Sequence, residues 1–221
     1  FDLIIYGSIR RSDLFLAEVI KYNNKFIFID GEDDNFIDAK YSNLGLYFKR
    51  ELLTKQTKIR SISFAIPKSK ILEKIDYSPK NILAPLIPGK LNTYIYDDES
   101  SYYEMYKKSI FALTYKKAGW DCLRHYEILM NGCIPLFLDI KNCPNNIIST
   151  LPKDQLINYL NNFNKIFSFY NPFKIFKKKY LTFQRIFSFL KFNYKKNNLE
   201  KFIQENREVF EIKKNLLDFT K

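Results

Sequence analysis

The segment 116–137 constrains the fold of this chain more than any other part of it. A short apolar run at 110–114 precedes it, and a polar, glycine-containing turn opens it. Asp121 is a favoured helix N-cap, and Gly132 is the residue type that commonly follows a helix end. Residues 134–138 are apolar again. This order predicts strand, turn, helix and strand, which together form a βαβ unit of an α/β fold.

A βαβ unit directs the N-terminus of its helix to the carboxyl ends of the strands, where phosphates bind. Lys116 and Lys117 precede the predicted helix, and Arg124 lies in its first turn. A cation there opposes the helix dipole unless an anion is bound. Arg124 and Glu127 share a helix face because they are three residues apart. These side chains fit a nucleotide diphosphate with its ribose, and they equally fit an exposed Arg–Glu pair on a surface helix.

The only tryptophan and the only histidine of the chain also lie in this segment. Trp120 can stack on a base or a sugar, or it can merely cover the turn. His125 can hydrogen-bond a phosphate or a sugar hydroxyl, since its unperturbed pKa is close to the working pH. The alternative for His125 is a packed or capping residue.

Two strings carry a resemblance to known enzymes: GWDCLRHYEIL at residues 119–129 and NGCIP at residues 131–135. Together they resemble the nucleotide-sugar site of GT-B glycosyltransferases. The first string is similar to a family of poorly characterised, exostosin-like glycosyltransferases of bacteria and large viruses. The segments YFKREL at 47–52 and SFAIP at 63–67 resemble the same family.

The resemblance implies an α/β fold with two Rossmann-like lobes of GT-B type and a helical C-terminal extension. It implies that Gly119 is the turn glycine and that Glu127 binds the ribose of a nucleotide-diphosphate sugar. The predicted donor site is completed by Lys116, Lys117, Trp120, Arg124 and His125. One departure matters: Gly119 stands where the common pattern has a second glutamate, eight residues before Glu127. The sugar-binding carboxylate of that motif is therefore absent or supplied elsewhere.

The implied reaction is transfer of a sugar from a nucleotide-diphosphate sugar to a glycan or lipid-linked acceptor, of the hexosyltransferase type. Basic side chains and a helix N-terminus would stabilise the departing diphosphate, so neither a metal nor a further cofactor is expected. An inverting enzyme also needs a base. Candidates lie in the acidic loop after the strand predicted at 26–29: Asp30, Glu32 and Asp33. A solvated turn is the alternative for this loop.

We expect three parts in the chain: an acceptor-side lobe at 1–80, a nucleotide-sugar-binding lobe at 81–150 and a basic helical extension at 151–221. In the first lobe the pattern predicts strands at 3–6, 26–29 and 59–66 and a helix at 13–22. In the second lobe, residues 82–89 are apolar, but Pro85 argues for an edge strand or a linker. A complete GT-B enzyme is usually longer than these 221 residues, so we expect a trimmed enzyme or part of a longer protein.

Helices are also predicted outside the βαβ unit. One begins at Asp97-Asp98-Glu99, with Tyr102 and Tyr106 at helical spacing for core packing. An amphipathic helix is predicted at 153–168, with Leu156, Leu160 and Phe163 facing inward. Further helices are expected around 183–192 and 198–217.

The charge of the chain is +12 and is uneven, because residues 151–221 hold 15 Lys and Arg against 6 Asp and Glu. Such a segment, with the cluster at 177–179, suits peripheral contact with an anionic membrane. Compositional bias toward lysine is the alternative, and nucleic acid is not expected as a partner. Three unpaired cysteines and the absence of a signal peptide or a long apolar run predict a cytoplasmic location. The alternative function is a non-catalytic basic protein that binds an anionic membrane surface or nucleic acid.

Overall fold

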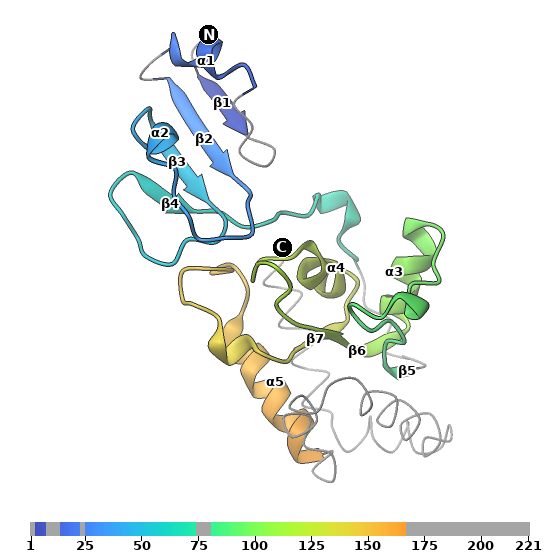
Figure 1. The fold of residues 1–221 in the computed structure, drawn as a ribbon. Helices are drawn as coiled ribbons and strands as arrows, with labels where there is room; N and C mark the ends of the chain where they lie inside the picture. The colour runs from blue at the N-terminus through green and yellow to red at the C-terminus, as the bar shows by residue number, and fades with distance from the viewer. Residues whose placement is uncertain (1–2, 8–13, 23–24, 74–80, 167–221) are drawn as a thin grey trace. The chain divides into compact units, whose positions relative to one another are not determined.

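The computed structural model describes residues 3–7, 14–22, 25–73 and 81–166 (Figure 1). It confirms an α/β fold, with two separate sheets in which all strands are parallel. Within the described ranges, no helix combines the length and the apolar character needed to cross a membrane.

The first sheet has four strands in the order β1-β2-β3-β4: β1 (Ile4–Gly7), β2 (Phe26–Asp30), β3 (Leu46–Lys49) and β4 (Ile59–Ser61). Two short helices, α1 (Leu16–Ile20) and α2 (Ala39–Ser42), lie in the first two connections. The core is aromatic, with the ring of Phe28 stacked on Tyr41 at a centroid distance of 4.1 Å. The predicted strands are confirmed, but β4 and α1 are shorter than expected.

The second sheet has three strands in the order β5-β6-β7: β5 (Asn81–Leu83), β6 (Ser109–Thr114) and β7 (Ile134–Phe137). Every residue of β6 and β7 is buried, as expected for parallel strands covered on both faces. Of the apolar residues 82–89, only Ile82 and Leu83 belong to a strand, β5, which lies at an edge of this sheet. Pro85 lies in the non-strand segment that follows, as the linker alternative predicts.

Helix α3 (Glu99–Lys107) precedes β6, and α4 (Leu123–Met130) connects β6 to β7. The predicted βαβ unit is therefore present. Asp98 caps α3 by accepting the Ser101 N–H at 2.8 Å. Tyr106 is buried in the core of the second sheet and Tyr102 packs against it, so the core packing predicted for both is confirmed.

The remaining elements are three 3-10 helices and one α-helix: η1 (Lys68–Lys70), η2 (Leu91–Thr93), η3 (Ile140–Asn142) and α5 (Lys153–Ile166). In α5, Leu156 and Leu160 are buried, as its periodicity predicts. The helices expected around 183–192 and 198–217, and the lysine cluster at 177–179, lie outside the described residues.

The chain forms two compact units, each made of more than one segment. Unit 1 consists of Phe1–Pro67, Tyr115–Tyr126 and Asp139–Pro152. Unit 2 consists of Lys68–Thr114, Glu127–Leu138 and the residues from Lys153 onward. These units follow spatial contacts, whereas the expected domains 1–80, 81–150 and 151–221 follow the sequence and stay a prediction.

The end of α4 generates a stability prediction. Gly132 has a φ of 68° and donates its N–H to the Leu129 carbonyl, while the Cys133 N–H reaches the Ile128 carbonyl at 3.1 Å. This is the Schellman arrangement, in which a left-handed residue ends the helix. Gly132→Ala should lower the free energy of unfolding by about 1–2 kcal/mol, because a Cβ is unfavourable in this conformation.

The matched control is Gly31→Ala, where an added Cβ would meet no atom within 4 Å and the backbone is not left-handed. Its effect should stay within about 0.5 kcal/mol. Urea unfolding of both variants makes the comparison, and equal losses would contradict this explanation of Gly132.

Candidate functional site

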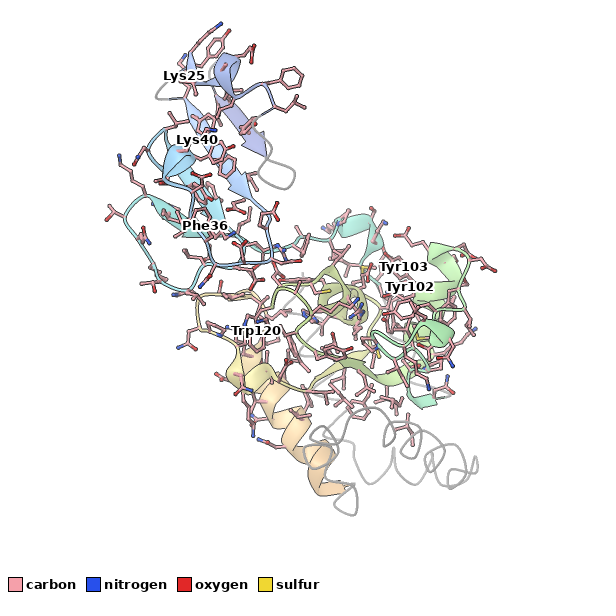
Figure 2. The ribbon with its side chains drawn as sticks, in the orientation of Figure 1. Lys25, Phe36, Lys40, Tyr102, Tyr103 and Trp120 are labelled. Atoms are coloured by element: carbon pink, nitrogen blue, oxygen red, sulfur yellow. The ribbon has the colours of Figure 1, made fainter. Side chains whose placement is uncertain are left out.

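The turn between β6 and α4 carries most of the donor-site residues that the sequence predicts. Lys116 and Lys117 are exposed, whereas Gly119 is buried and Trp120 is partly buried. The Lys116 N–H donates to the Asp139 carboxylate, and the Lys116 ammonium lies 5.3 Å from the centre of the Trp120 ring (Trp120 is labelled in Figure 2). A cation over an aromatic face is an attractive contact, so Trp120 covers one side of the turn.

Arg50, directly after β3, fixes the chain that leads into α4. Its guanidinium is buried and donates to the Gly31 carbonyl, the Asp33 carboxylate and the Asp121 carbonyl. A planar guanidinium has five donors, so one side chain can hold several acceptors in fixed directions. Within unit 1, Arg50 therefore links the acidic loop after β2 to the turn before α4.

Glu51 adds a second link between the same segments. This carboxylate is only 3% exposed and accepts the Asp121 N–H at 2.8 Å. It also lies against Gly119: a Cβ built there would be 2.6 Å from Glu51 Oε1 and 2.9 Å from Asp33 Oδ1. The structure thus brings together Gly119 and Asp33, two residues predicted for different roles. The close approach of the Glu51 and Asp33 carboxylates, and not an unusual φ, explains why residue 119 is a glycine.

Asp121 does not cap α4, contrary to the sequence-based expectation. Its buried carboxylate accepts the Phe64 N–H at 3.0 Å and the Tyr126 hydroxyl at 2.9 Å. Helix α4 begins two residues later, and the His125 N–H donates to the Cys122 carbonyl at 3.0 Å. Burial raises the pKa of Asp121 above its ordinary value, although the hydrogen bonds from Tyr126 and Phe64 oppose the shift. A long-range partner has replaced the local cap.

His125 is fully buried, and its Nε2 lies 2.9 Å from the Trp120 carbonyl. Because a carbonyl only accepts, Nε2 carries the proton and donates it. Burial is the main cause that lowers the pKa of His125 to about 4, with a contribution from the Arg124 charge, and the hydrogen bond to Trp120 opposes the shift. The neutral ring holds the turn in place, as the packed alternative predicts. A ligand role for His125 stays a prediction.

Arg124 and Glu127 lie one turn apart on α4. Arg124 is only 9% exposed, so the alternative of an ordinary exposed Arg–Glu pair is wrong. The Glu127 carboxylate is partly buried and accepts the Tyr102 hydroxyl at 3.0 Å. The Asn131 amide donates to the Glu127 backbone carbonyl at 2.8 Å, which steadies the end of the helix.

The three candidate bases differ in their surroundings. Asp30 is 2% exposed, accepts the Tyr47 hydroxyl and the Glu32 N–H, and pairs with the buried Lys49 ammonium at 2.9 Å. Glu32 is partly exposed, and the Asp33 side chain is 52% exposed. The Asp30 carboxylate is thus buried and paired, while Glu32 and Asp33 are accessible to solvent.

Sequence reasoning did not assign Lys49, Arg50, Glu51 and Asp121 to the site. A signal for three of them was present, because consecutive charged residues directly after a buried strand must lie at its carboxyl end. The same residues belong to the YFKREL string that carries part of the family resemblance.

Comparisons with protein-family models, curated proteins and solved structures find no match to this chain.

Gly119→Ala tests the close packing of the turn. The new Cβ would displace the Glu51 carboxylate, which is held by the Asp121 N–H and lies 3.8 Å from the Arg50 guanidinium. We expect a loss of roughly 1–3 kcal/mol in the free energy of unfolding, the scale of overpacking a buried position. Chemical denaturation measures it, with Ala118→Ser at the exposed neighbouring position as the control. A stability equal to that of the control would show that the turn has room for a side chain.

The pKa of His125 makes stability depend on pH. Because the folded-state value of about 4 lies below the ordinary 6.5, the unfolded chain binds a proton first as the pH falls. The stabilisation is complete above pH 6.5 and is lost progressively toward pH 4. Between pH 6.5 and 5 the free energy of unfolding should fall by about 1.5 kcal/mol from this group.

Denaturant unfolding at successive pH values, for the wild type and His125→Gln, isolates this contribution. Since the chain has one histidine, its NMR titration reports the folded-state pKa directly. Parallel pH profiles for the two proteins would contradict a buried, neutral His125.

Proposed function

We propose that this chain is a glycosyltransferase of GT-B type that binds a nucleotide-diphosphate sugar through the segment 116–127 and needs no metal. The observation that carries the proposal is the unit β6–turn–α4–β7. In it, a turn with two exposed lysines follows the carboxyl end of a parallel strand, and a carboxylate lies one turn into the next helix. The acceptor is a glycan or a lipid-linked acceptor.

The topology supports a phosphate ligand. In open parallel sheets, ligands bind beyond the carboxyl ends of the strands, where helix N-termini favour negative charge. Many α/β proteins share this arrangement, and the resemblance of residues 119–135 to a nucleotide-sugar site narrows the proposal to sugar donors.

The described side chains suit the parts of such a donor. Lys116 and Lys117 can neutralise the diphosphate as the sugar departs, a charge that forms in the transition state. Arg124 adds a fixed cation in the first turn of α4. The Glu127 carboxylate accepts hydrogen bonds from ribose hydroxyls, and the partly exposed Trp120 ring can stack on a base or a sugar.

The candidate bases differ in how accessible their carboxylates are to an acceptor. For an inverting reaction, Glu32 and Asp33 are the better choices, since a base must reach the acceptor hydroxyl and Asp30 is buried in an ion pair with Lys49. Asp33 accepts a hydrogen bond from Arg50, which holds the orientation of its carboxylate.

Calorimetric titration with UDP, GDP and their sugar conjugates tests the proposal. Binding of a nucleoside diphosphate supports it. No binding of any of them, together with binding of oligonucleotides or anionic vesicles, would instead favour a non-catalytic basic binding protein.

Two substitutions test the assigned donor contacts. Glu127→Ala and Arg124→Ala should each weaken nucleotide-diphosphate binding by roughly 1–3 kcal/mol, the scale of hydrogen bonds to charged groups. Matched controls are Glu104→Ala, which removes a partly exposed carboxylate from α3, and Arg60→Ala, which removes an exposed cation from β4. Circular dichroism checks that each variant is folded. Affinities equal to those of the controls would contradict the assignment.

A further inference from the structure

Two tyrosines of α3 form a hydrogen-bonded chain that ends on Glu127. The Tyr102 hydroxyl donates to Glu127 Oε2 at 3.0 Å, and the hydroxyls of Tyr102 and Tyr106 are also 3.0 Å apart. All three residues belong to unit 2. Tyr102 and Tyr103 are labelled on α3 in Figure 2.

The number of hydroxyl protons decides which group donates in each of these two hydrogen bonds. A phenol hydroxyl has one proton, and Tyr102 uses it to donate a hydrogen bond to the Glu127 carboxylate. Tyr106 must therefore donate to the Tyr102 oxygen. This bond polarises the Tyr102 hydroxyl and makes it a better donor, because consecutive hydrogen bonds strengthen one another.

Packing of the aromatic rings also holds Tyr102 and Tyr106 in place, in addition to the hydrogen bond between their hydroxyls. Tyr106 is 1% exposed, and its ring meets that of Tyr102 edge-on at a centroid distance of 5.0 Å. Tyr96 contacts the other ring at 6.3 Å, also edge-on. The Tyr102 hydroxyl is thus a rigid donor on a rigid helix, and it fixes a glutamate side chain that would otherwise sample several rotamers.

A glutamate fixed in this way is suited to recognising hydroxyl groups. An ionised carboxylate is a pure acceptor with about four lone-pair sites, so one bond from Tyr102 does not exhaust it. The two ribose hydroxyls are donors, and a preorganised acceptor binds them without the entropic cost of ordering the side chain.

We propose that Tyr102 is a positioning residue that holds Glu127 for the ribose diol, so that the donor site selects ribonucleoside diphosphates over their dideoxy forms. This inference rests on the proposed function. A site built to hydrogen-bond a hydroxyl rejects a ligand that lacks it, because a buried acceptor is then left unpaired. Tyr102 itself does not touch the nucleotide.

The experiment measures discrimination rather than affinity alone. Calorimetry with UDP and GDP and with their 2′,3′-dideoxy forms gives a ribose preference for each protein. In the wild type we expect a preference of at least tenfold, and Tyr102→Phe should reduce it about tenfold, the scale of one hydrogen bond to a charged group. Affinity for the dideoxy forms should stay within about twofold of the wild type, since they do not use the Glu127 contact.

Tyr103→Phe is the matched control, because it removes a hydroxyl from the neighbouring position of α3 that donates to Glu99 at 2.6 Å. It should keep the wild-type ribose preference. A general loosening of α3 would reduce binding of ribose and dideoxy ligands alike, and it would not change their ratio.

The outcomes separate the two hypotheses. If the wild type prefers the ribose forms and Tyr102→Phe keeps this preference, the role of Tyr102 is wrong while the proposed function stands. If the wild type binds the diphosphates without preferring ribose, the diol contact is wrong and the inference falls. If the wild type binds no nucleoside diphosphate, the proposed function fails and the inference fails with it.

Discussion

The arrangement of unit 1 depends on the buried guanidinium of Arg50. A buried charge is tolerated only where it is paired and hydrogen-bonded, and this one binds two backbone carbonyls and the carboxylate of Asp33. The two carbonyls belong to Gly31 and Asp121, in segments far apart in the sequence. Removing one partner of such a network typically costs several kcal/mol, because the others are left buried and unsatisfied. The turn before α4 therefore takes its position from β3 as well as from its own sequence.

This network separates two kinds of residue within the segment 116–127. Gly119 is small because carboxylates occupy the space of a side chain, and Asp121 satisfies a backbone N–H of residue 64. His125 holds the Trp120 carbonyl. These residues build the turn. Lys116 and Lys117 are exposed, so a ligand can reach their side chains. A sequence motif can thus consist of residues that build the backbone of a site as well as residues that contact the ligand.

The sequence predicts those strands and helix ends that depend on local residue patterns. It does not predict the hydrogen bonds that join residues far apart in the chain. The strand β2 follows from its continuous run of apolar β-formers, and the end of α4 follows from Gly132, whose conformation disfavours other residues. The cap at Asp121 was wrong because the Phe64 N–H competes successfully for the same carboxylate. No periodicity could reveal that Arg50 reaches both Gly31 and Asp121. The sequence analysis did not predict the strand β3, and only the fold supplies the partners of the charged residues at its end.

The contacts that hold the predicted site residues differ in how strongly the salt concentration affects them. Asp33 is half exposed, so salt screens its attraction to Arg50, whereas the bonds from Arg50 to the Asp121 carbonyl (buried) and to the Gly31 carbonyl (partly buried) are dipolar contacts that salt affects less. At high ionic strength the turn should keep its backbone attachments and lose part of the orientation of the Asp33 carboxylate. Glu127 is held by an uncharged donor, the Tyr102 hydroxyl, on which salt has little effect. A salt-induced loss of activity with unchanged ribose preference would therefore point to the acidic loop or to screened lysines, and not to Glu127.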